Sequence, residues 1–181
     1  MKATVSRILV PVDFSECSRA ALEFAVALAG HMGAIVDVLH VWESPYPIGY
    51  GMEATLLSQF SQAQAGTELE EFLAAIDDHS GPPGTIHSHL ETGIPSETIL
   101  KVAENDQYDL IVMGTHGRTG KHYWLVGSLA AELVRRAPCP VLTIRPPRRL
   151  AKSARGKSNH LRMRRDKAEH EAMITAQGGG V

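Results

Sequence analysis

The stretch that decides the fold of this chain is Asp109-Leu110-Ile111-Val112-Met113-Gly114-Thr115-His116-Gly117-Arg118, which is followed later by Gly127-Ser128. Its first part, Leu110–Met113, is a continuous run of large apolar residues, which is typical of a parallel strand buried on both faces. From Ser128 to Pro138 the apolar residues have the spacing of a helix. The stretch therefore predicts a strand, a glycine-rich loop and the start of a helix, in that order.

The loop between this strand and this helix has the composition of a phosphate-binding site. Glycines permit positive φ angles and a close approach of a ligand to the main chain, and a helix start offers unpaired N–H groups and the positive end of its dipole. The Ser128 hydroxyl can add a hydrogen bond, and Arg118 a positive charge. A tight turn that binds nothing explains each glycine equally well on its own. The complete spacing, with two residues between Gly114 and Gly117 and nine between Gly117 and Gly127, favours the binding site.

Runs of β-branched or aliphatic residues predict strands that alternate with helices. The strands are expected at Ile8–Val12, Ile35–Trp42, Thr85–Glu91, Leu110–Met113 and Val141–Arg145. The helices are expected from the Ser15 cap to Gly30 or Gly33, from about Glu53 to Asp78, from Pro95 onward, and from Ser128 to Pro138. The apolar positions of the second helix are Leu56, Leu57, Phe60, Leu69, Phe72, Leu73 and Ile76. This alternation predicts an α/β fold, with a parallel sheet, right-handed crossovers and helices on both faces.

The overall composition is that of a globular protein with a distinct C-terminal part. Of its 181 residues, 44% are hydrophobic and 21% are charged, which is usual for a soluble domain with one core. Up to Pro147 the chain carries nine Lys and Arg against seventeen Asp and Glu, whereas from Arg148 onward nine basic residues stand against three acidic ones. We therefore expect one domain over residues 1–147 and a flexible basic extension over residues 148–181.

The same sequence disfavours several classes of protein. Cys17 and Cys139 are the only cysteines, too few for a disulfide framework or a zinc site. Because no apolar run is long enough to span a bilayer and the N-terminus has no signal-peptide core, we expect a cytoplasmic protein. The basic extension lacks aromatic residues for base stacking, so we expect it to be solvated rather than to bind nucleic acid.

Three motifs in this order resemble the universal stress protein family, and specifically its ATP-binding branch. They are Ile8–Ser15, Asp109–Arg118 and Ala137–Leu142, and the glycine spacing is that of the family's nucleotide motif. The resemblance extends over almost all of residues 1–145. It implies a three-layer α/β/α fold of the Rossmann-like, adenine nucleotide alpha hydrolase type, with five parallel strands in the order 3-2-1-4-5. In such a sheet a ligand binds beyond the carboxyl ends of the strands, where the order reverses between strands one and four.

The resemblance also implies which residues bind ATP, with Mg²⁺ held mainly through the phosphates. The position of Asp13 lies beside the adenosine, that of Val41 offers backbone groups to the adenine, and those of the glycines and Ser128 surround the ribose and phosphates. The expected binding residues are Pro11, Val12, Asp13, Val41, Met113, Gly114, Thr115, His116, Gly117, Arg118, Gly127, Ser128 and Leu129. For Asp13, a carboxylate that caps the following helix is the alternative interpretation.

Other residues leave alternatives open. Lys121–Trp124 is bulkier and more polar than the family pattern, so the segment either shields the phosphates, pairs with them through Lys121, or fills the site. His116 either acts as a base or, as we prefer, orients the loop. His87 and His89 share one face of a strand with the spacing of a metal pair, although a solvated strand face is the preferred interpretation. Cys17 lies in the first turn of a helix, where a thiolate is favoured.

Binding of ATP does not by itself make the protein an enzyme. The chain has no Walker lysine motif and no kinase signature set, and neither a catalytic residue nor a metal ligand can be named from it. We expect a nucleotide-dependent stress-response regulator. A slow ATPase or autophosphorylating protein with Ser128 as acceptor is one alternative, and an adaptor that binds no nucleotide is another. The resemblance further implies a homodimer through the last strand, Val141–Arg145, and a protein partner that the sequence does not identify.

Overall fold

The computed structural model describes residues 4–44, 51–76, 86–116 and 127–145, and the structural statements below concern these ranges. The elements are β1 (Arg7–Val12), α1 (Glu16–Met32), β2 (Ile35–Trp42), α2 (Gly51–Ala74), β3 (Ile86–Thr92), α3 (Pro95–Asn105), β4 (Leu110–Gly114), α4 (Ser128–Arg136) and β5 (Val141–Ile144). Every predicted strand and helix is therefore present, at nearly the predicted bounds. The predicted basic extension over residues 148–181 lies outside the described ranges.

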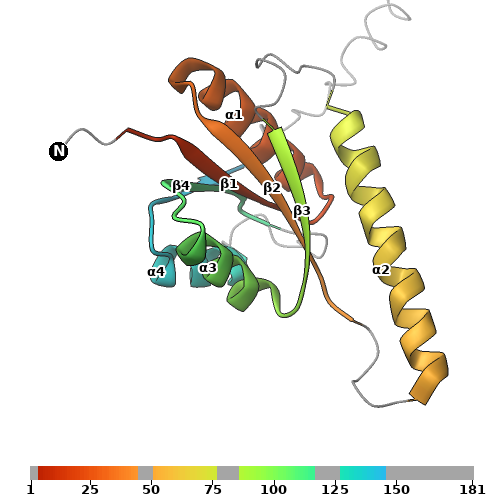
Figure 1. The fold of residues 1–181 in the computed structure, drawn as a ribbon. Helices are drawn as coiled ribbons and strands as arrows, with labels where there is room; N and C mark the ends of the chain where they lie inside the picture. The colour runs from red at the N-terminus through yellow and green to blue at the C-terminus, as the bar shows by residue number, and fades with distance from the viewer. Residues whose placement is uncertain (1–3, 45–50, 77–85, 117–126, 146–181) are drawn as a thin grey trace, which may run out of the picture. The chain divides into compact units, whose positions relative to one another are not determined.

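The strands form one parallel sheet in the order β3-β2-β1-β4-β5, which confirms the predicted topology. Figure 1 shows α1 and α2 on one side of this sheet and α3 and α4 on the other. Side chains alternate between these two layers along β1, because successive residues of a strand point to opposite faces. Ile8 and Val10 pack in the core beneath α1 and α2, whereas Leu9 packs beneath α3 and α4. All three are fully buried, so β1 reads as continuously apolar in the sequence.

Helix α1 has both of the terminal signals that the sequence suggested. Ser15 is its N-cap, and its side chain accepts a hydrogen bond from the Ser18 backbone N–H. At the other end Gly33 adopts a left-handed conformation with φ of 69°, which a residue with a side chain adopts only at a cost. Of the two glycines proposed to end the helix, Gly33 is therefore the one that does so.

The side chains of helix α2 that join the apolar core come from its C-terminal half. Leu69 and Phe72 are buried in the core, whereas Leu56, Leu57 and Phe60 are exposed by 60%, 46% and 73%. These three residues were expected among the apolar positions of this helix, but they do not join the core. A helix of 24 residues is about 36 Å long, but strands of seven or eight residues span only about 25 Å. The helix is thus longer than the sheet that it covers, as Figure 1 shows.

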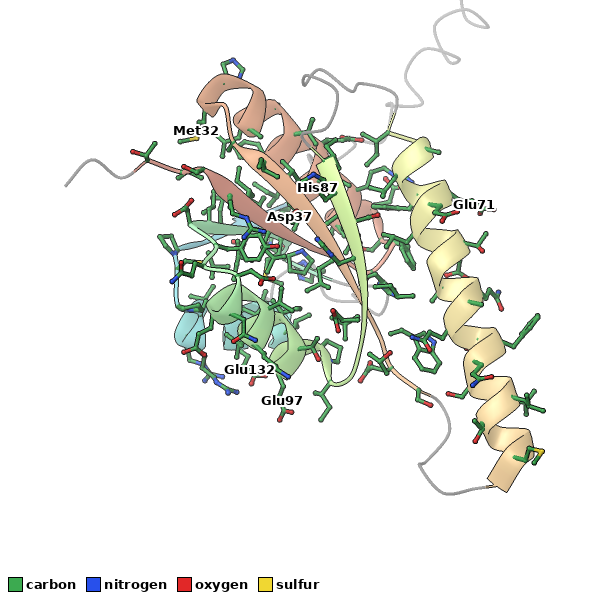
Figure 2. All side chains as sticks on the ribbon, viewed as in Figure 1. Met32, Asp37, Glu71, His87, Glu97 and Glu132 are labelled. Carbon is green, nitrogen blue, oxygen red and sulfur yellow. The ribbon has the colours of Figure 1, made fainter. Side chains whose placement is uncertain are left out.

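A buried carboxylate joins β1, β2 and β3 at the amino ends of these strands. Asp37 on β2 is 1% exposed, and its Oδ2 accepts a hydrogen bond from Arg7 Nη2 at 2.9 Å. Its Oδ1 lies 3.0 Å from His87 Nδ1 and 3.6 Å from His89 Nε2; Figure 2 labels Asp37 and His87 on the neighbouring strands. Burial raises the pKa of Asp37, but hydrogen bonds from Tyr108, Arg7 and His87 outweigh burial and leave the pKa below its ordinary value.

The two histidines are half exposed, as a solvated strand face requires, but each also faces the buried Asp37. Within the described ranges, no group of three or more His, Cys, Asp or Glu side chains is arranged to hold a metal ion. His87 and His89 thus both lie beside the buried carboxylate of Asp37, a contact that their spacing in the sequence did not reveal.

Gly114 ends β4 at a point where α1 leaves no room for a side chain. A Cβ atom at this position would lie 2.8 Å from both the carbonyl carbon and the Cβ of Cys17, in the first turn of α1. Two non-bonded carbon atoms do not come this close, so the backbone would have to shift to admit a side chain. The absence of a side chain at Gly114 therefore has a packing function, whether or not a ligand binds nearby.

Replacing Asp37 with asparagine tests the buried ion pair. At neutral pH we expect Asp37→Asn to lower the free energy of unfolding by about 1–3 kcal/mol, because hydrogen bonds to a charged group are lost. Since the pKa of Asp37 is lowered in the folded state, its carboxylate contributes stability above about pH 4. This contribution is lost as the pH falls through the lowered folded-state pKa. Unfolding followed by circular dichroism should therefore show a difference between variant and wild type that shrinks in acid.

The matched control is Glu91→Gln, which neutralises an exposed carboxylate on β3. It should change the free energy of unfolding by less than about 0.5 kcal/mol. If Asp37→Asn is as stable as the wild type at neutral pH, the ion pair does not stabilise the fold.

Replacing Gly114 with alanine tests the close approach of α1. We expect Gly114→Ala to destabilise the protein by about 1–3 kcal/mol, because the added methyl group overpacks the contact with Cys17. The control is Gly66→Ala within α2, where a Cβ atom would meet only a Leu90 side-chain carbon, at 3.8 Å. That change should be neutral or stabilising by up to about 1 kcal/mol, because alanine favours a helix. Urea unfolding measures both, and an unaffected Gly114→Ala variant would show that α1 can move away at little cost.

Candidate functional site

A cavity of about 590 Å³ opens at the carboxyl ends of β1, β2 and β4. It lies where the strand order reverses, the position at which open α/β sheets bind ligands. The first turns of α3 and α4 border it through Pro95 and Ser128, and α2 contributes Ser61. Its volume lies within the roughly 300–1,000 Å³ that small-molecule sites have.

Eleven of the thirteen residues predicted to bind ATP line this cavity. They come from β1, β2, β4 and α4, and from the turns after β1 and β4: Pro11, Val12, Asp13, Val41, Met113, Gly114, Thr115, His116, Gly127, Ser128 and Leu129. The other two, Gly117 and Arg118, lie outside the described ranges, as does the bulky segment Lys121–Trp124. Residues from distant parts of the sequence thus meet at one place.

Nine further residues line the cavity without having been predicted: Ser18, Leu39, His40, Trp42, Glu43, Ser61, Pro95, Ile99 and Ala130. His40 and Trp42 flank the predicted Val41 on β2, and Ala130 follows the predicted Leu129 on α4. These residues could have been predicted from the bounds of the two elements. Ile99 and Ser61 carry no such signal, because their contribution depends on how α3 and α2 pack against the sheet.

The turn from β1 into α1 holds Asp13 in place. Asp13 Oδ1 accepts hydrogen bonds from the Ser15 hydroxyl at 2.6 Å and from the Ser15 backbone N–H at 3.2 Å. Between them Phe14 has a φ of 64°, which is uncommon for a residue with a side chain. Ser15 is itself the N-cap of α1, so Asp13 supports the cap rather than forming it. Asp13 thus takes part in capping and also faces the cavity.

His40 joins the cavity wall to the rest of the core. Its Nδ1 lies 2.8 Å from the Val12 carbonyl oxygen, which can only accept, so Nδ1 carries the hydrogen. The imidazole ring lies 4.3 Å from the Phe14 ring, and the Phe14 ring lies 5.5 Å from that of Phe72 on α2. The strained turn after β1 is therefore held by a row of rings that connects β2 to α2.

The two ends of the glycine-rich loop are fastened to each other. The Gly127 backbone N–H donates to the Thr115 carbonyl at 2.8 Å, and the Thr115 N–H donates to Ile144 on β5 at 3.0 Å. A Cβ atom at Gly127 would lie 3.1 Å from the same Thr115 carbonyl oxygen, so glycine suits this close approach. The Thr115 hydroxyl lies 2.9 Å from His116 Nδ1, which supports an orienting role for His116.

The start of α4 faces the cavity without a side-chain cap. Gly127 is its N-cap residue and has no side chain. The backbone N–H groups of the first turn therefore receive no hydrogen bond from a capping side chain. Among the described lining residues the charged ones are Asp13 and Glu43, and none is a lysine or an arginine. An anionic ligand here would therefore depend on the helix N-terminus and on a cation that it brings with it.

Cys139 packs against the apolar core on the α3 and α4 side of the sheet. Burial raises the pKa of its thiol, and the negative charge of Asp109 adds to the increase. Cys139 is therefore a partly buried packing residue. No described helix combines the length and the apolar character of a membrane span.

Comparison with known proteins identifies the family. The model of the universal stress protein family matches residues 4–145. The universal stress protein MJ0531 of Methanocaldococcus jannaschii is 31% identical over 146 residues, which cover 79% of this chain and 84% of that protein. The structure of universal stress protein UspA from Lactobacillus plantarum has a TM-score of 0.67 and 28% identity, covering 78% of this chain and 98% of that one.

A more distant structure, of a universal stress protein from Archaeoglobus fulgidus in complex with dAMP, shares the fold. Its TM-score is 0.56 and its identity 23%, over 78% of this chain and 99% of that one. The motifs, the strand order and the family model agree. This chain belongs to the universal stress protein family.

Proposed function

We propose that this protein binds ATP with Mg²⁺ in the cavity at the carboxyl ends of β1, β2 and β4, and that it acts as a nucleotide-dependent stress-response regulator. The observation that supports the proposal is that eleven of the predicted binding residues, from four separate segments of the chain, line one cavity. The dAMP complex of the Archaeoglobus fulgidus protein supports an adenine nucleotide as the ligand class.

The adenine is proposed to lie against the Val41 backbone. Leu39 and Ile99 are buried and give this part of the cavity an apolar wall, and Pro95 begins α3 beside it. An apolar wall next to a strand backbone suits a flat aromatic base with hydrogen-bonding edges. Asp13, held by Ser15, is oriented to accept hydrogen bonds from the adenosine moiety.

The phosphates are proposed to lie at the first turn of α4. There the Gly127 backbone approaches closely, and Ser128 adds a hydroxyl group to the uncapped N–H groups. Because the described lining contains carboxylates and no basic side chain, Mg²⁺ bound to the phosphates would offset their charge. Arg118, which lies outside the described ranges, remains a proposed second source of positive charge.

We propose a regulator in preference to an enzyme. A base would be required for hydrolysis, and His116 is the candidate that the sequence offers. Its contact with the Thr115 hydroxyl supports orientation of the loop instead. Slow hydrolysis of ATP, or phosphorylation of Ser128, remains the second candidate, because the Ser128 hydroxyl lines the cavity at the proposed phosphate position. Formation of ADP by purified protein, lost in Asp13→Asn and Ser128→Ala, would favour that candidate.

We further propose a cytoplasmic homodimer that pairs through the last strand. β5 is an edge strand of the sheet, and its four residues are only half-buried in the single chain. An open edge strand of this kind is usually covered or paired. Residues 148–181, outside the described ranges, are proposed to be a flexible basic extension, and the regulated partner is proposed to be another protein.

Isothermal titration calorimetry with Mg²⁺ and ATP tests the proposed site. We expect the wild type to bind and Ser128→Ala to bind about 10–100-fold more weakly, because one hydrogen bond to a charged group is lost. Asp13→Asn should also weaken binding, by a similar factor. The control is Ser96→Ala, which removes a hydroxyl from the first turn of α3 at a position that does not line the cavity.

Two results would overturn the proposal. A folded wild type that binds neither ATP nor AMP would favour the adaptor interpretation. Equal losses in Ser96→Ala and Ser128→Ala would mean that the phosphates do not lie at α4.

A further inference from the structure

The N-terminal half of α2 carries an apolar surface that no other described element covers. Met52, Leu56 and Phe60 recur every four residues and therefore share one face of the helix. They are exposed by 82%, 60% and 73%, and Leu57 beside them is exposed by 46%. We call these four residues the α2 ridge. The core side chains of this helix come from its C-terminal half, so the ridge has no packing function within the described ranges.

The size of the α2 ridge distinguishes it from ordinary surface leucines. The largest apolar patch on a typical monomer covers roughly 300–600 Å² and is often functional. Four large side chains on one helix face, each exposed by about half or more, present a patch of that order. If such a patch met a second one, the area buried would reach the lower end of specific protein interfaces, about 1,000–1,200 Å². The ridge thus suits a weak, reversible partner.

The charges along α2 restrict what that partner can be. Between residues 51 and 67 the only charged residue is Glu53, whereas Glu68, Glu70 and Glu71 follow directly on the C-terminal half. A partner with an oppositely charged surface would therefore gain no electrostatic attraction at the ridge itself. A second copy could pair there without repulsion only if the two acidic halves pointed away from each other, and antiparallel pairing has that property.

We propose that the α2 ridge is a homotypic interface, in which two copies pair their α2 helices in antiparallel orientation across a twofold axis at Leu56. The spacing of the ridge fits this symmetry, because Met52 and Phe60 are each four residues from Leu56. Leu56 then meets its own copy, and Met52 of one chain packs on Phe60 of the other. Thioether–aromatic contacts of this kind are favourable. An interface that is its own complement is what a twofold axis requires.

This interface differs from the proposed pairing through β5. α2 covers β2 and β3, and β3 lies at the opposite edge of the sheet from β5. Two separate twofold interfaces in one chain allow assembly beyond a dimer. We therefore expect the wild type to gain one association step at high protein concentration, whether or not the β5 dimer forms.

Site-directed cross-linking tests the proposed geometry. In a background of Cys17→Ser and Cys139→Ser, Leu56→Cys should be joined into a covalent dimer by a short bis-maleimide. Gln64→Cys, also on exposed α2 surface, should not, because two residues at position 64 would lie about 24 Å apart in the antiparallel pair. Absence of a cross-link at position 56, or equal cross-linking at both positions, would overturn the proposed pairing.

Sedimentation velocity of the uncross-linked protein provides the second test. Leu56→Glu/Phe60→Glu places like charges opposite each other and should abolish one association step, which halves the largest mass observed. Both positions are exposed, so circular dichroism and the thermal midpoint should remain those of the wild type. Gln64→Glu/Thr67→Glu adds the same charge elsewhere on α2 and should leave the mass unchanged. A double variant that assembles like the wild type would show that another partner, or none, covers the ridge.

Discussion

Parallel pairing of β1 with both β2 and β4 is the constraint on which the rest of the structure depends. β1 is fully buried over most of its length and forms the middle of the sheet. The chain leaves β1 through α1 on one face and comes to β4 through α3 on the other. The segments that follow β1 and β4 therefore diverge from adjacent strands, and the cavity opens between them. A binding site at this place is a consequence of the topology before any side chain is considered.

The glycines at this site have a packing function in addition to the ligand approach that we propose for them. Gly114 is required by the contact with Cys17, and Gly127 by the contact with the Thr115 carbonyl. Both contacts belong to the protein itself. Glycine spacing alone would therefore persist in a relative that had lost its ligand but kept α1 and α4 in place. Residues such as Asp13 and Ser128, which protein packing does not dictate to the same degree, are better evidence for binding.

Local signals in the sequence predicted the elements and their order along the chain, whereas the eleven expected residues that line the cavity were implied by the family resemblance. Apolar runs, the Ser15 cap and Gly33 each act within a few residues. What the sequence did not reveal depends on packing between distant segments. The ion pair of Arg7 with Asp37 and the contact of His87 with the same carboxylate need the register of three strands. Ser61 reaches the cavity only because of how α2 packs. The strand order itself came from the family resemblance, since periodicity does not determine it.

The N-terminal half of α2 contributes both to the cavity and to the α2 ridge. Ser61 lines the cavity, and Phe60 of the α2 ridge is its sequence neighbour. A nucleotide that contacts Ser61 would restrict the N-terminal half of α2, and pairing of two ridges would restrict the same half. Because coupling between two binding events is reciprocal, a nucleotide that favours ridge pairing must itself bind more tightly to the paired form. If both proposals hold, the long overhang of α2 gives this fold a direct physical route from nucleotide occupancy to assembly.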